Sequence, residues 1–204
     1  MNCRNWRTWL LAAAVGLWLA AAPAFGADER AQPPKEVIER VGDLLGRITD
    51  ELWIHNDEFW HQGEYRWCIA ILGVITELDP HDTEAFGNRG WLLWNIGEND
   101  TAEAVLKKGI SLNPNSYELF YDLGMHYYKL QRYDDAIHTL KTAQPLGLPD
   151  VGWKLLAHSY ERSNRLDECI AVWEELEKME TGDPAVEFNL SRLRDKAADV
   201  GNRE

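Results

Sequence analysis

The sequence predicts an all-α protein: a right-handed α-solenoid of about four antiparallel helix hairpins, with an extra helix before them and a capping helix after them. Apolar residues recur at helical spacing through most of the 204 residues, and no long stretch alternates as a strand does. The chain also repeats itself at steps of 34, 34, 33 and 34 residues, in lines that begin at Thr49, Thr83, Tyr117, Asp150 and Pro184. A nearly constant step of this length is typical of stacked helical hairpins, and the solenoid is expected to span residues 35–199.

The composition is that of a folded protein with an acidic surface. Hydrophobic residues make up 45% of the chain and charged residues 27%, and the formal net charge is −13. Binding to nucleic acid needs clustered lysines and arginines, so a nucleic-acid partner is not expected.

Residues 1–26 are predicted to be a secretory signal peptide, with an uncleaved membrane anchor as the alternative. Basic residues precede the apolar run Leu10–Ala22, and small residues follow it up to Gly26, which is the order found in secretory signals. Trp9–Ala27 carries no charge and is long enough to span a bilayer. Residues 27–34 are expected to be a linker. We therefore expect an exported protein, periplasmic or extracellular, or one held at the inner membrane by its N-terminus.

Residues 35–48 continue the helical pattern ahead of the first unit. Either a separate helix caps that unit, or one helix runs from about 35 to 61; Gly42 and Gly46 weaken the second alternative without forbidding it. Trp53 is expected to pack against residues 35–48. The stripe that runs through both segments consists of Val37, Val41, Leu44, Leu45, Ile48, Leu52 and Phe59.

Each repeat unit is predicted to be two antiparallel helices that approach closely where small side chains face each other. One small column lies on the first helices and one on the second helices, and bulky columns fill the space between hairpins. The small columns are Asn56, Gly90, Gly124, Ala157, Ser191 and Cys68, Ala102, Ala136, Cys169. The bulky columns are Leu72, Leu106, Leu140, Trp173 and Phe59, Leu93, Tyr127, Tyr160.

Cysteines are predicted to act as fillers. Cys68 and Cys169 share a column but lie three units apart, too far for a disulfide when packed helices are ~8–10 Å apart. We expect both thiols to be buried, reduced and inert.

Turns and unit ends follow the same step. Unit three ends in Pro145–Pro149 and should therefore have a shortened second helix. A last helix at 184–199, with a charged outer surface, should cap the array before a short tail at 200–204. The hairpin turns are expected at 62–64, 97–99, 131–132 and 163–164, and Asp79-Pro80 and Asn113-Pro114 close the first two units.

This pattern resembles the tetratricopeptide repeat family over roughly residues 49–199. Departures include Asn56 in place of the usual Gly, His55 in place of the usual Leu, and Gly109 where Ala is common. The resemblance implies a superhelix in which the first helix of each hairpin lines a concave face. It also implies the scaffolding roles that such proteins have in assembly, secretion or regulatory complexes of bacterial envelopes. Unit three matches best, through Phe120, Leu123, Gly124, Tyr127, Tyr133, Ala136, Leu140 and Ala143.

Helical phase places an aromatic-rich set of side chains on that concave face. Large aromatic rings with a polar atom are typical of surfaces that bind peptides. The predicted protein-binding groove consists of Asp57, Trp60, His61, Trp91, Trp94, Asn95, Tyr121, Met125, Tyr128, Lys129 and His158.

Core packing is the alternative for the rings of this set, Trp60, Trp91, Trp94, Tyr121 and Tyr128. Three tryptophans outside it, Trp67, Trp153 and Trp173, are predicted to belong to the hairpin cores.

The partner is expected to be an apolar or basic protein segment. Some members of the family clamp a partner's C-terminal carboxylate with inner-face cations. The corresponding positions hold Trp53, Asp57, Gly87 and Trp91, so no such clamp is expected here. Acidic surroundings favour a segment without negative charge.

No motif predicts catalysis, a metal or a cofactor. Asp57 and His61 share a helix face, but no third ligand follows at a suitable spacing. His126 and His138 are interpreted as filler or surface, and neither a phosphate-binding glycine loop nor a nucleophile elbow occurs. We therefore expect a non-catalytic interaction scaffold of the bacterial envelope. The alternatives are a membrane-tethered accessory subunit and a small-molecule-binding accessory protein.

Overall fold

The computed structural model describes residues 34–179 and 182–201. The predicted signal peptide or anchor and nearly all of the predicted linker lie outside these residues, and so do residues 180–181 and 202–204. No helix of the described part is both long and apolar enough to cross a membrane. The chain divides between Asp43 and Leu44 into two compact parts, which we call the N-terminal part and the C-terminal part.

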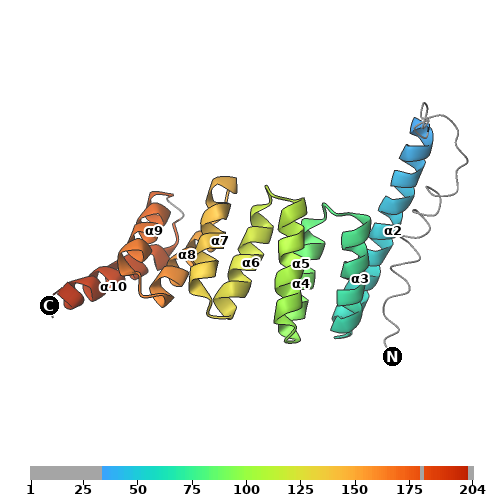
Figure 1. The fold of residues 1–204 in the computed structure, drawn as a ribbon. Coiled ribbons are helices and arrows are strands. Elements are labelled where there is room, and N and C mark those ends of the chain that lie inside the picture. Colours follow the sequence, from blue (N-terminus) through green and yellow to red (C-terminus); the bar gives the residue numbers. More distant parts are fainter. Residues whose placement is uncertain (1–33, 180–181, 202–204) are drawn as a thin grey trace, which may run out of the picture. The chain divides into compact units, whose positions relative to one another are not determined.

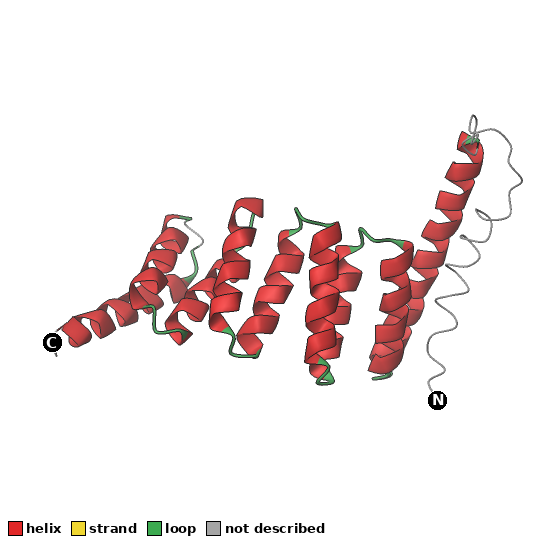
Figure 2. Cartoon of the chain, viewed as in Figure 1, coloured by secondary structure: helices red, strands yellow, loops and turns green. Residues whose placement is uncertain are grey.

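Helices account for nearly all of the described chain, and no strand occurs in it (Figure 2). The all-α prediction is confirmed. The elements are α2 (Lys35–His61), α3 (Tyr65–Leu78), α4 (Thr83–Asn95), α5 (Asn99–Leu112), α6 (Tyr117–Lys129), α7 (Tyr133–Ala143), the 3₁₀ turn η1 (Gln144–Leu146), α8 (Asp150–Arg162), α9 (Leu166–Lys178) and α10 (Pro184–Gly201).

Helix α2 is continuous from Lys35 to His61, so the single-helix alternative is correct. The side chains of residues 34–43, the described residues of the N-terminal part, are all exposed. Residues 44–48 lie in the same unbroken helix as Trp53 and cannot fold back over its ring, so the packing predicted there is wrong for these residues. Trp53 packs instead on the cluster around Leu72, and its Nε1 donates a hydrogen bond to Asp82 Oδ2 at 3.0 Å.

In the C-terminal part, each helix from α3 onward packs against the next one along the chain. First helices of successive hairpins also touch, α4 with α6 and α6 with α8 (Figure 1). This pattern of contacts is that of an α-solenoid, in which each hairpin rests only on its neighbours.

Helices approach closely at the small columns. A Cβ at Gly90 would lie 2.7 Å from Leu106 Cγ, and a Cβ at Gly124 would lie 2.7 Å from Leu140 Cγ. The same obstruction thus occurs in two successive units. Ala157 is fully buried, whereas Ser191 is exposed on α10, so the buried column ends one unit earlier than the sequence suggests.

All four hairpin turns place one residue in the left-handed region, at steps of 34, 34 and 33. Gly63 and Gly97 have φ values of +76° and +83°, and Gln131 and Asn164 have φ values of +60°. In all four turns the residue after the left-handed one donates its backbone N–H to the carbonyl of the residue five positions before it, as Glu64 does to Phe59. The third and fourth turns therefore adopt the strained conformation without glycine.

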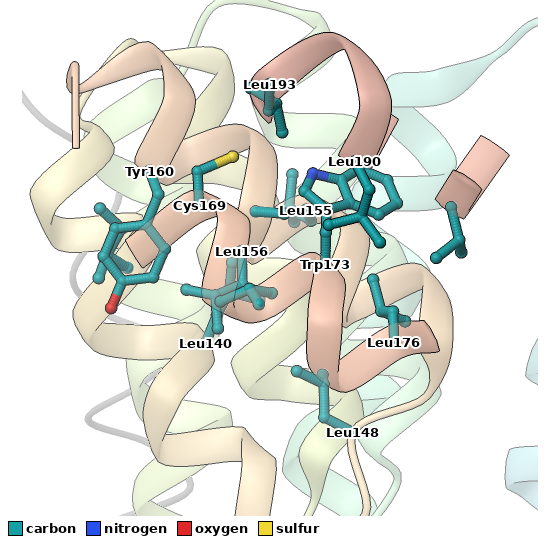
Figure 3. Close-up of a cluster of buried hydrophobic side chains, with 14 of the residues drawn as sticks. Leu140, Leu148, Leu155, Leu156, Tyr160, Cys169, Trp173, Leu176, Leu190 and Leu193 are labelled. Carbon is teal, nitrogen blue, oxygen red and sulfur yellow. The ribbon is translucent and has the colours of Figure 1, made fainter. Parts of the chain in front are cut away.

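The largest core cluster joins α7, α8, α9 and α10 (Figure 3). Trp173 lies inside it at 1% exposure, and Trp153 packs on its edge, with Nε1 donating to the Leu148 carbonyl at 3.1 Å. Trp67 is 58% exposed, and its predicted core position is wrong. Residue 68, not 67, faces the core, so the Trp67 ring only stacks on Phe59 at 6.1 Å.

Unit three has the shortened second helix that its Pro-rich end predicts. Helix α7 has 11 residues, compared with 14 in α3 and α5, and it passes into η1 and then Gly147. Cys68 and Cys169 are free and fully buried, as predicted. Burial raises the pKa of both thiols, that of Cys169 to about 11.

A network centred on Glu103 ties unit two to unit three. Its carboxylate accepts hydrogen bonds from Lys107 Nζ at 2.6 Å, Tyr127 Oη at 2.9 Å and Arg132 Nη1 at 2.6 Å. Burial alone would raise the pKa of Glu103, but these three donors outweigh it and lower the pKa to about 2. The charged form of Glu103 therefore stabilises the junction between the two units.

Candidate protein-binding surface

Two neighbouring open cavities lie along helices α4 and α6, and we call them together the α4–α6 cleft. The first has a volume of about 330 Å³ and the second about 700 Å³. Gly87, Trp91 and Asp122 line both of them. The first is completed by Gly90, Trp94, Leu106, Tyr121, Met125, His126 and Lys129, and the second by Trp60, Thr83, Glu84, Asn88 and Glu118.

Six of the residues predicted for the groove line this cleft. They are Trp60, Trp91, Trp94, Tyr121, Met125 and Lys129. The other five line neither cavity. They are Asp57, His61, Asn95, Tyr128 and His158.

Two of these five bond to each other within α2. The His61 ring Nδ1 lies 2.8 Å from the Asp57 carbonyl and 3.5 Å from its carboxylate. Both side chains are exposed, and no three His, Cys, Asp or Glu side chains of residues 34–179 and 182–201 gather as they would around a metal ion. Asn95 is likewise exposed and donates to the Trp91 carbonyl one turn earlier at 2.7 Å.

The remaining two contribute to packing between helices. Tyr128 meets the Tyr133 ring edge-on at 5.6 Å, and His158 meets the Trp173 ring edge-on at 5.6 Å. Burial lowers the pKa of His158, so this imidazole behaves as a neutral packing group.

The aromatic rings of the cleft remain accessible. Trp60 and Trp91 are 39% and 48% exposed, and their ring centroids are 5.6 Å apart. Trp94 and Tyr121 are half-buried, each packing on a core cluster with one side. Lys129 Nζ lies 5.8 Å from the centroid of the Trp94 ring, within the range of a cation–π contact.

Asp122 is a cleft residue that the sequence patterns did not single out. Its side chain is half-buried, and within the described chain no hydrogen bond or ion pair reaches its carboxylate. Burial, with a smaller contribution from the charge on Glu118, raises its pKa to about 6.

Gly87 is what makes room for this carboxylate. The equivalent positions of the other units hold Trp53, Tyr121 and Lys154. A Cβ at Gly87 would collide with Asp122 Oδ2. A repeat position that holds a large side chain in three units and a glycine in one is the sequence signal that could have located this site.

His126 forms part of the wall beside α5. It is only 5% exposed, and neither ring nitrogen has a hydrogen-bond partner at normal distance and angle. Burial lowers its pKa, although the Glu103 charge and the nearby Asn99 backbone act in the opposite direction. Of the two interpretations offered for His126, filler between helices fits this position.

Comparisons with known proteins agree on the fold. Residues 93–157 match the family model described as tetratricopeptide repeat. The BBSome complex member BBS4 of Xenopus tropicalis is 23% identical over 127 residues, which cover 62% of this chain and 25% of that protein. This chain thus spans about a quarter of the length of that relative.

Solved structures with a similar fold include MamA from Desulfovibrio magneticus RS-1. It is 18% identical with a TM-score of 0.61, covering 74% of this chain and 86% of the other. Pseudomonas aeruginosa PilF is 15% identical with a TM-score of 0.61, covering 76% of this chain and 71% of the other. The family match covers α5, α6, α7 and η1 with the end of α4 and the first part of α8, and the hairpins on either side repeat the same packing, so the chain contains tetratricopeptide repeats.

Proposed function

We propose that this protein is a non-catalytic scaffold that binds an extended segment of a partner protein in the α4–α6 cleft. One observation carries the proposal: two large aromatic side chains, Trp60 and Trp91, stand beside each other over a cleft while both remain more than a third exposed. Exposed aromatic rings at the edge of a concavity are typical of the residues that dominate protein–protein binding.

The charges of the cleft favour an apolar or basic segment. Glu84, Glu118 and Asp122 line it, and Lys129 is the one cation among its lining residues. Lys129 lies over the Trp94 ring. A segment rich in carboxylates would meet like charges here, whereas a basic or neutral one would not.

We further propose that the protein works outside the cytoplasm, as part of an assembly. The export proposal is supported by the basic, apolar and small-residue regions of the first 26 residues. That one relative is named as a member of a complex favours a role within an assembly. The charge-free run Trp9–Ala27 favours a second candidate, an accessory subunit tethered by an uncleaved N-terminus. The mass of the mature N-terminus distinguishes cleavage from tethering.

The binding proposal is tested by site-specific photocrosslinking in the cells that make the protein. A photoreactive phenylalanine derivative replaces Trp91 in one strain and Trp67 in a matched control. Both residues are exposed tryptophans, but Trp67 lies outside the cleft. We expect a discrete crosslinked product from position 91 and none from position 67.

Affinity provides the second measurement. Once the partner is identified, Trp91→Ala should weaken its binding at least about tenfold, the size typical of a central aromatic contact, and Trp67→Ala should leave it unchanged. Equal crosslinking at both positions, or equal loss of affinity in both variants, would show that the cleft is not the binding surface.

A further inference from the structure

We infer that the notch between Gly87, Trp91 and Asp122 holds the cationic end of a lysine or arginine side chain of the bound segment. This inference rests on the proposed function and assigns one position of the ligand. It follows from the state of one carboxylate, from the missing side chain beside it and from the rings around it.

The first argument is the carboxylate itself. Asp122 lies at the junction of the two cavities, half-buried and without a hydrogen bond or ion pair in the described chain. Burying a carboxylate without a partner costs free energy, and proteins normally supply a cation or a donor at such a position. Here the space in front of the carboxylate is open to a ligand instead.

The second argument is that no cation of the cleft neutralises it. Lys129 lies on the same helix, seven residues further on, which places its backbone about 10 Å away along the axis. Its ammonium group lies over Trp94 and makes no ion pair with Asp122. The protein's own cation is therefore committed to the far end of the first cavity.

The third argument is the shape of the notch. Gly87 occupies a repeat position that is Trp53, Tyr121 or Lys154 in the other units, so the volume of a large side chain is absent from the wall. Even a methyl group there would displace the Asp122 carboxylate. The glycine thus creates the space and fixes the position of the charge that faces it.

The fourth argument is the chemistry of the walls. Trp91 lines both cavities beside Asp122, and its ring is accessible. An ammonium or guanidinium group between an indole face and a carboxylate gains both a cation–π contact and a charge-assisted hydrogen bond. The second cavity opens the notch toward Trp60 and Glu118, so the backbone of a longer segment can continue past the bound side chain.

The test uses small probes that carry only the side chain in question. The full chain is titrated with N-acetyl-arginine methylamide and, as its neutral isostere, N-acetyl-citrulline methylamide, and the indole N–H signals of Trp91 and Trp94 are followed by NMR. A single contact of this kind corresponds to a Kd in the millimolar range. We expect the arginine probe, and N-acetyl-lysine methylamide with it, to shift the Trp91 signal in a saturable way, and citrulline to leave it in place.

Two variants locate the effect. Asp122→Asn keeps the shape of the side chain and removes its charge, and it should reduce the arginine-induced shift at least about fivefold. Gly87→Ala should do the same by displacing the carboxylate. Asp100→Asn is the matched control, because Asp100 is exposed on α5 and lines neither cavity.

The outcomes separate this inference from the function on which it rests. If crosslinking at position 91 captures a partner but arginine and citrulline probes act alike, or neither acts, the scaffold proposal stands and the cationic notch is wrong. An arginine response that survives in Asp122→Asn also overturns the notch. If position 91 captures no more than position 67, the scaffold proposal fails whatever the probes do.

Discussion

Replacing Asp122 by Asn should stabilise the folded protein at neutral and alkaline pH, although the substitution removes a charge from the proposed binding site. The reason is that the carboxylate is half-buried without a partner. An asparagine has nearly the same shape and does not have to carry a charge into that environment.

The magnitude follows from the pKa of Asp122, which is raised from its ordinary 3.8 to about 6 in the folded protein. Between these two values the folded state holds a proton that the unfolded state has lost, so the free energy of unfolding falls as the pH rises. This difference in pKa lowers the free energy of unfolding by about 3 kcal/mol above pH 6, and about half of that loss is already present near pH 5.

The assay is urea denaturation of wild type and Asp122→Asn, followed by circular dichroism at about pH 5 and about pH 8. All other acids titrate in both proteins and cancel in the comparison. The variant should be the more stable one at both values, by about 3 kcal/mol near pH 8 and about half as much near pH 5.

A stability difference that does not change with pH would refute the argument, because it would mean that Asp122 has an ordinary pKa in the folded protein. A variant less stable than wild type near pH 8 would refute it as well, since the carboxylate would then have a partner that the described contacts do not include.

Three further predictions, made with five substitutions, test the fold. Glu103→Gln should lower the free energy of unfolding by about 2 kcal/mol at neutral pH. The stabilisation by the Glu103 carboxylate is present above about pH 4.5 and is lost as the pH falls toward 2. An unchanged urea midpoint at pH 7 would contradict this prediction. Gln131→Gly should raise the free energy of unfolding by about 1 kcal/mol and Asn164→Gly by less, because Asn tolerates the left-handed region better than Gln; a lowered melting temperature of the first variant would count against the turn argument. Gly124→Ala should destabilise by about 1–3 kcal/mol against Leu140, whereas Gly42→Ala, with nothing within 4 Å, should be neutral or stabilising, and parallel urea titrations of the two compare them.

The hairpins were predictable because close helix packing leaves a direct trace in the sequence. A residue such as Gly124 is small for a reason that the next unit repeats 34 positions away, and the contact with Leu140 bears it out. The position of Trp67 was not predictable in the same way. It differs from Cys68 by one step of about 100° around α3, and aromatic character alone does not say which of two neighbours faces inward.

The candidate site was only half predictable, because it depends on contacts between different units. The position of a residue around its helix was sufficient to predict that Trp91 and Tyr121 line the cleft, since both lie on first helices of hairpins. It was not sufficient for Tyr128 and His158, whose phase is similar but whose neighbours in α7 and α9 cover them. Asp122 needed knowledge that Gly87, 35 residues earlier, lies against it.

Gly87 also has a bearing on how a duplicated chain can diversify. Neighbouring hairpins pack on each other, so a mutation that enlarges a buried residue disturbs them, whereas a mutation that shortens a side chain lining the cleft leaves those contacts in place. A single truncation of this kind leaves the stack intact and gives one copy a recess of its own. In a protein built from repeats, shortening one side chain can therefore give one repeat a distinctive surface with less disruption than inserting a new loop.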